Sequence, residues 1–187
     1  MERLKRDIER FCPINEQEQR DKEIMLKWIA GGGDILTREN DAAHLTASAW
    51  VVNQSRDKVL MAYHNIYDSW AWLGGHADGE KDLLKTALKE AEEESGIKEI
   101  RPLSSDIFCL EVLSVDGHEK KGVYIPSHLH LNITYILEAS EEDELMINPD
   151  ENKGVAWICF NDIKNRSSEP WYVKRIYSKL IKKTSML

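Results

Sequence analysis

The chain has 187 residues, of which 42% are hydrophobic and 31% charged, so it is long enough to bury a core of its own and length favours one domain. Its formal net charge of -8 excludes proteins that hold a nucleic-acid backbone through an excess of Lys and Arg, because such binding requires phosphates to be neutralised. No segment approaches the roughly 20 apolar residues of a membrane span. We therefore expect a soluble, cytoplasmic protein whose partners are neither a nucleic-acid polymer nor a membrane.

Two helices are predicted near the N-terminus. Residues 2–11 fit a short helix that is broken by Pro13. A second helix is predicted to begin at Asn15, which precedes Glu18 by three residues as in a capping box. The glycines at 31–33 are a strong signal for its end. The start of this part of the chain is therefore helical.

Strand-like runs dominate from Thr46 onward, with one long helix between them and a last helix over residues 169–183. Hairpins outnumber βαβ crossovers, so we expect an α+β fold in which a mixed sheet lies between helices. We interpret residues 1–40 as a helical extension packed on the core, and residues 41–187 as the main domain. Three roles are open for the extension: covering a cleft, mediating a homodimer, or packing on the sheet. The predicted strands are TASAWVVN, VLMAY, WAWL, IFCLEVLSV, HLHLNITYIL and GVAWICF.

The long helix carries a cluster of carboxylates. Glu90, Glu93 and Glu94 are neighbours at helical spacing, although like charges so placed cost a few tenths of a kcal/mol per pair. Acidic runs are most often solvated. Here a loop with three glycines precedes the helix and Gly96 follows it, and hard divalent cations take carboxylate oxygens together with phosphates and water. This context favours a metal site. The apolar stripe beside the cluster is predicted to comprise Leu84, Ala87, Leu88 and Ala91.

The stretch GGHADGEKDLLKTALKEAEEESGI resembles the Nudix hydrolase signature, G-x5-E-x7-R-E-U-x-E-E-x-G-U, where U is aliphatic. The match is specific in KEAEEESGI, and the flanking strands extend the resemblance over residues 41–163. It implies an α/β/α sandwich and hydrolysis, with Mg²⁺ or Mn²⁺, of the diphosphate bond in a nucleoside diphosphate linked to another moiety. Attack would come from a metal-activated water. The metal ligands that the resemblance implies are Glu90, Glu93, Glu94 and Gly75.

The first half of the signature departs from the pattern. Counted from Gly75, the glutamate position falls on Lys81; counted from Gly74, it falls on Glu80, with eight residues instead of seven before Lys89. A one-residue shift in the loop explains this. The shift leaves three possible roles for Glu80: it caps the helix, it binds metal weakly, or it does neither. Lys89 replaces the signature's arginine, and we expect the exchange to be tolerated because a salt bridge needs only a cation there.

Two glutamates are the expected catalytic residues. In many relatives the general base is either a glutamate of the signature, here Glu93, or an acid in the loop before the last core strand. That loop, NPDENKG, offers Asp150 and Glu151, and we favour Glu151. The alternative is an ordinary polar loop acid.

The candidate substrate-binding residues are His64, His76, Trp72 and His130. His128, His130, Asn132 and Thr134 share one face of a predicted strand, which is either a solvent-facing polar stripe or the lining of a substrate cleft. Markers for ADP-ribose, dinucleoside polyphosphates and coenzyme A are absent, so the substrate stays open.

Two other functions fit the same fold. One is a nucleotide-binding or regulatory module without turnover, which the irregular spacing favours. The other is an isoprenoid diphosphate isomerase, which needs a cysteine paired with a glutamate. Cys109 and Cys159 lie on predicted strands without the usual context of such a pair, and strand cysteines are often inert, which disfavours the isomerase. The three cysteines, Cys12, Cys109 and Cys159, lie far apart without metal-binding spacing and indicate free thiols in a reducing compartment.

Overall fold

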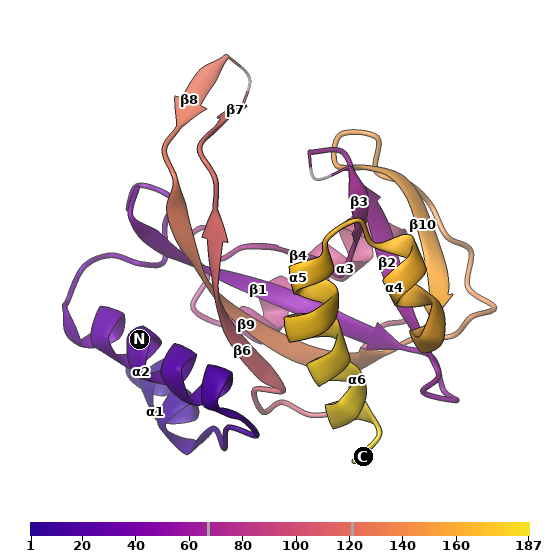
Figure 1. Ribbon diagram of the computed structural model, residues 1–187, viewed down its shortest axis with the longest axis horizontal. Helices are drawn as coiled ribbons and strands as arrows, with labels where there is room; N and C mark the ends of the chain where they lie inside the picture. The colour runs from indigo at the N-terminus through magenta and orange to yellow at the C-terminus, as the bar shows by residue number, and fades with distance from the viewer. Residues whose placement is uncertain (67, 121) are drawn as a thin grey trace. The chain divides into compact units, whose positions relative to one another are not determined.

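A computed structural model describes residues 1–66, 68–120 and 122–187 (Figure 1). The chain forms two compact units, each built from separate segments. The first unit contains residues 1–48, 75–86 and 105–135, and the second contains residues 49–74, 87–104 and 136–187. Within the described ranges, no helix combines the length and the apolar character needed to cross a bilayer.

The helical elements are α1 (Glu2–Arg10), α2 (Glu16–Ala30), α3 (Leu83–Ser95), the 3₁₀ turn η1 (Phe160–Asp162), α4 (Ile163–Arg166), α5 (Pro170–Tyr172), the π-helical turn η2 (Val173–Tyr177) and α6 (Ser178–Thr184). The strands are β1 (Ala43–Val52), β2 (Lys58–His64), β3 (Ser69–Ala71), β4 (Leu73–His76), β5 (Arg101–Pro102), β6 (Cys109–Val115), β7 (His118–Lys120), β8 (Val123–Ile125), β9 (His128–Glu138) and β10 (Asn152–Cys159).

In the first unit, α1 and α2 lie side by side and α2 packs on β6 (Figure 1). The start of α2 follows the predicted capping box: the Asn15 side chain accepts the Glu18 N–H at 2.9 Å, and the Glu18 carboxylate accepts the N–H of Ile14 at 2.9 Å. Glu18 is fully buried against β6, where the thiol of Cys109 donates to it at 2.9 Å. One glutamate therefore both caps the helix and joins it to the sheet.

Strands β6 and β9 form a long antiparallel pair in the first unit, with a register that runs from Cys109↔Thr134 to Val115↔His128. The pair leads into the β7–β8 hairpin, which was not predicted (Figure 1). Val123 and Tyr124 on this hairpin are exposed, so it lacks the buried apolar pattern by which strands are recognised in a sequence.

The polar face of β9 is not a solvent-facing stripe, so that interpretation was wrong. Asn132 and Thr134 are buried, and both share hydrogen bonds with the Glu111 carboxylate, which accepts from Asn132 Nδ2 and from Thr134 Oγ1 at 3.1 Å each. The hydroxyls of Thr46 and Ser48 on β1 donate to Asn132 Oδ1, each at 2.9 Å. Hydrogen bonds to partners on two neighbouring strands therefore offset the cost of burying this polar face.

In the second unit, β2 pairs antiparallel with β1 (Val52↔Val59), with β3 (Tyr63↔Trp70) and with β10 (Ile158↔Val59). The predicted last helix is present as α5, η2 and α6 in succession, with the π-helical turn in its middle. It packs on Trp50, whose indole Nε1–H donates to Thr184 Oγ1 at 3.1 Å. The Trp50 ring stacks on Phe160 and Tyr177, with ring centroids 6.0 and 6.1 Å away.

Two local predictions around α3 were wrong. Gly74 and Gly75 do not lie in a loop, because β4 extends through both of them to His76. The buried stripe of α3 is also rotated from the predicted one: Leu84 and Leu88 are only half-buried, whereas the fully buried positions include an acid. Those buried positions are Leu83, Thr86, Ala87, Ala91, Glu94 and Ser95.

Candidate metal-binding and catalytic site

The three clustered glutamates of α3 range from buried to exposed. Glu94 is 6% exposed, the Glu90 side chain is 15% exposed, and the Glu93 side chain is 49% exposed. The cluster therefore extends from the core to the solvent. It is not the fully solvated acidic face that a run of acidic residues usually forms.

Glu94 is held in place by main-chain and side-chain groups of the second unit. The N–H of Gly74 on β4 donates to its carboxylate, and the Asn152 amide on β10 donates to its main-chain oxygen at 3.0 Å. Burial nevertheless raises the pKa of the Glu94 carboxyl well above 4.5, and the charges of Glu151 and Glu90 raise it further. The carboxylate form is therefore costly without a cation.

Glu90 lies in the same electrostatic environment. Burial raises the pKa of its carboxyl, the Lys89 ammonium opposes that rise, and the charges of Glu151 and Glu93 add to it. Lys89 Nζ lies 3.0 Å from Glu93 and 3.5 Å from Glu90, so lysine makes salt bridges at the arginine position of the signature. One exposed ammonium pairs with the outer glutamates of the cluster.

Glu151, which lies in the loop before β10, belongs to this cluster because its charge raises the pKa of both Glu90 and Glu94. Its carboxylate accepts from Asn148 Nδ2 at 3.3 Å. Nearby, Asn152 Oδ1 is buried without a hydrogen-bond partner among the described residues. Crowded carboxylates beside a buried amide oxygen are the donor set that Mg²⁺ or Mn²⁺ prefers, so the residues fit such an ion.

The raised pKa of Glu94 predicts how the stability of the metal-free protein depends on pH. Below 4.5, the ordinary value, the carboxyl is protonated in the folded and unfolded states, and it adds no penalty. As the pH rises from 4.5 through the raised pKa, the unfolded state ionises first and stability is lost. In thermal melts with EDTA, the melting temperature of Glu94→Gln minus that of the unaltered protein should grow from pH 5 to pH 8. A constant difference would contradict the prediction.

Glu80 is engaged at the start of α3. Its carboxylate lies 2.8 Å from Lys85 Nζ and accepts the N–H groups of Lys81 and Asp82 at 2.8 and 3.0 Å. The hydrogen bond from Lys85, followed by those from the N–H groups of Asp82 and Lys81, lowers the pKa of Glu80 to about 2. Of the three roles considered, the capping of local backbone groups is the one that these contacts fit.

The other two candidate residues of the second unit lie at the end of β2 and between β3 and β4. His64 ends β2, and its Nδ1 accepts the N–H of Ile66 at 3.1 Å. Trp72 is half-buried and meets Tyr177 edge-on, with ring centroids 5.9 Å apart. Packing on an aromatic neighbour fits a core tryptophan as well as a substrate contact, so the role of Trp72 stays a prediction.

His76 and His130 come together with His44 in the first unit. One ring nitrogen of each lies within 4.8 Å of the other two. Among the described residues, these three form the group of His, Cys, Asp or Glu side chains that are close enough together to hold a metal ion. Burial lowers the pKa of His44, and burial together with the neighbouring imidazoles lowers the pKa of His130 to about 2. His44 was missed, because it lies on β1, far in sequence from the other two, and nothing in its local pattern marks it.

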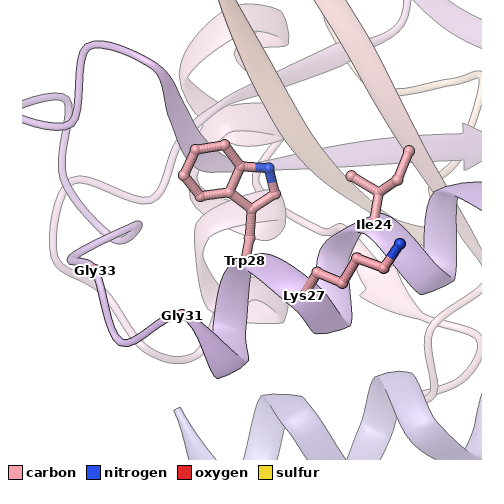
Figure 2. Close-up of a pocket in the computed structure, with 5 residues that line it drawn as sticks. All are labelled: Ile24, Lys27, Trp28, Gly31 and Gly33. Carbon is pink, nitrogen blue, oxygen red and sulfur yellow. The ribbon is translucent and has the colours of Figure 1, made fainter.

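One hollow in the first unit lies away from these residues. It has a volume of about 340 Å³ and lies at the end of α2, where Trp28 and Ile24 project from the same side of the helix (Figure 2). Its other lining residues are Lys27, Gly31 and Gly33. None of the predicted site residues lines it.

A family model described as NUDIX domain matches residues 42–180 of the chain. A comparison with curated proteins gives no match. The match to the family model agrees with the signature in α3 and extends beyond it, to the C-terminal helix.

Solved structures with the same fold include an Ap4A hydrolase from C. elegans in a binary complex (18% identity, 76% of this chain and 95% of that one, TM-score 0.52). Others are a NUDIX-family hydrolase from Clostridium perfringens (19%, 76% and 97%, 0.54) and the E. coli dihydroneopterin triphosphate pyrophosphohydrolase (13%, 74% and 95%, 0.54). The likeness confirms the α/β/α sandwich with a mixed sheet, here carrying N-terminal helices in addition.

Proposed function

The chain belongs to the Nudix family and is a Nudix-type pyrophosphohydrolase, and we propose that it uses Mg²⁺ or Mn²⁺ to cleave the diphosphate bond of a nucleoside diphosphate linked to another moiety. The observation that supports the metal most directly is the burial of Glu94 and Glu90 with raised pKa values beside Glu151. A divalent cation would offset the repulsion among these acids.

In this proposal Glu90, Glu93 and Glu94 hold the ion together with Gly75, whose donor would be its main-chain oxygen. The ion would polarise a phosphoryl oxygen and lower the pKa of a bound water. Lys89 orients Glu93 through their 3.0 Å ion pair, which keeps that carboxylate at the edge of the cluster.

The chain's own proton acceptor is proposed to be Glu151, with Glu93 as the second candidate. The water oxygen bonds to one phosphorus while the bridging P–O bond breaks, the base takes the water's proton, and a phosphate leaves. Glu151 is half-buried on a loop, and its charge raises the pKa values of Glu90 and Glu94. Its carboxylate therefore lies close to the proposed metal ligands, where the attacking water would be bound.

The nucleotide-like class of substrate is supported by the similar structures, since the names of two of them refer to Ap4A and to a pterin triphosphate. His64 and Trp72 are the proposed substrate contacts. A cationic or neutral imidazole suits phosphate, and an indole suits a base or ring.

The test is a panel of nucleoside triphosphates, dinucleoside polyphosphates, nucleotide sugars and ADP-ribose, each incubated with Mg²⁺, Mn²⁺ or EDTA and analysed by ³¹P NMR. We expect cleavage of at least one class with metal and none with EDTA. Glu93→Gln should lower the rate, while Glu92→Gln, the same change on the preceding residue of the helix, should not. Tight binding in calorimetry with no product from any compound would instead identify a regulatory module without turnover.

A further inference from the structure

A cluster of imidazoles in the first unit has ligand chemistry different from that of the carboxylates. His44 on β1, His76 on β4 and His130 on β9 bring ring nitrogens within 4.8 Å of one another. The ring centroids are 5.1 Å apart for His44 and His76, 5.1 Å for His44 and His130, and 4.9 Å for His76 and His130. Three strands thus contribute one imidazole each.

The ring of His44 has a defined orientation. Its Nδ1 lies 3.1 Å from the main-chain oxygen of Asn40, and because a carbonyl only accepts, Nδ1 carries the proton. Nε2 therefore presents a lone pair. This nitrogen is buried and has no hydrogen-bond partner among the described residues, and the whole side chain is only 4% exposed. A buried lone pair without a donor is a costly arrangement that a bound cation would satisfy.

His128 orients the ring of His130 through a hydrogen bond. Its Nδ1 donates to the Pro126 carbonyl oxygen at 2.8 Å, so Nε2 of the neutral ring accepts the 3.2 Å hydrogen bond from Nε2 of His130, and the lone pair of His130 lies on its Nδ1. The main-chain acceptor of His44, the oxygen of Asn40, matches the outer contacts that usually orient metal-bound histidines.

The ligand type decides which ion fits. Neutral imidazole binds Zn²⁺ and related transition metals, whereas Mg²⁺ prefers oxygen. Burial keeps the His44 and His130 rings uncharged near neutral pH, because it lowers the pKa of both. These two rings can therefore bind a cation without first releasing a proton from a charged imidazole.

We propose that His44, His76 and His130 form a binding site for a divalent transition-metal ion such as Zn²⁺, separate in ligand type from the carboxylate cluster. The ion would tie together β1, β4 and β9 and fix the segment that precedes α3. This role replaces direct substrate contact for His76 and His130.

The experiment is a titration of the metal-free full chain with Co²⁺ and Zn²⁺ in excess Mg²⁺, which occupies oxygen sites. Bound metal is measured by elemental analysis after dialysis and by the visible spectrum of Co²⁺. We expect one equivalent in the unaltered chain and in His64→Gln, the matched control. His44→Gln and His130→Gln should each weaken binding by at least about 100-fold.

Two results would overturn the site. One is undiminished binding in both His44→Gln and His130→Gln when circular dichroism shows them folded. The other is loss of the bound equivalent in Glu94→Gln, which would place the ion at the carboxylates. If the histidine variants do not fold, ¹⁵N NMR of the unaltered chain decides: Zn²⁺ should shift the Nε2 resonance of His44, and an unchanged resonance rejects the proposal.

Discussion

Replacing Glu94 by Gln is expected to lower kcat for metal-dependent hydrolysis by about 10²- to 10³-fold, the range seen when one group that stabilises the transition state is removed. The same change should raise the melting temperature of the metal-free protein. Both effects have one origin: the buried carboxylate, whose pKa burial and neighbouring acids raise, destabilises the folded state until a cation binds it. Gln keeps the volume and an acceptor for the Gly74 N–H.

The measurement pairs steady-state kinetics over a Mg²⁺ series with thermal melts in EDTA. Glu92→Gln is the matched control, since it makes the same chemical change on a half-buried residue of α3 that is not a predicted ligand. A Glu94→Gln protein that is less stable without metal, or as active with it, would show that Glu94 has a structural role only.

Gly96→Ala should destabilise the protein by about 3 kcal/mol, from a strained backbone and an overpacked contact together. Gly96 follows α3 with φ +78, a left-handed conformation that suits glycine. An added Cβ would lie 2.7 Å from Met146 Cβ and 3.1 Å from Met146 N. Met146 cannot easily withdraw, because its N–H donates to the Ser95 oxygen at 2.8 Å.

Gly32→Ala separates the two causes. Gly32 has φ +71, but an added Cβ would meet nothing within 4 Å, so only the cost of the left-handed conformation remains, about 1 kcal/mol. Urea unfolding of both variants measures the difference. Equal losses would mean that the Met146 contact relaxes, and that crowding at the end of α3 adds nothing.

Local signals were predictable from the sequence because both partners lie within a few residues. Asn15 and Glu18 defined the start of α2, and Glu90, Glu93 and Glu94 were recognisable as a cluster from helical spacing alone. What the spacing does not contain is the depth of each side chain. That depends on how α3 packs, and the buried stripe proved to include Glu94 in place of Leu84 and Leu88.

Contacts between distant segments account for the other differences. Asn132 and Thr134 alternate with apolar residues as in a half-exposed strand, yet Glu111 on the paired strand makes them a buried face. The same limit applies to His44: its neighbours His76 and His130 come from other strands, and only the folded chain brings the three together. The division into residues 1–40 and 41–187 stays a prediction.

The hydrogen bonds on the inner face of β9 have a consequence for how the chain finds its fold. A slip of β9 by one residue would point Leu131 and Ile133 at Glu111 and at the β1 hydroxyls, and every one of those polar groups would lose its partner in a dry environment. In most sheets such a slip only moves hydrophobic side chains from the buried face to the exposed one. Here the misaligned pairing also costs the hydrogen bonds of buried polar groups. Refolding from denaturant should therefore give a single register of β9.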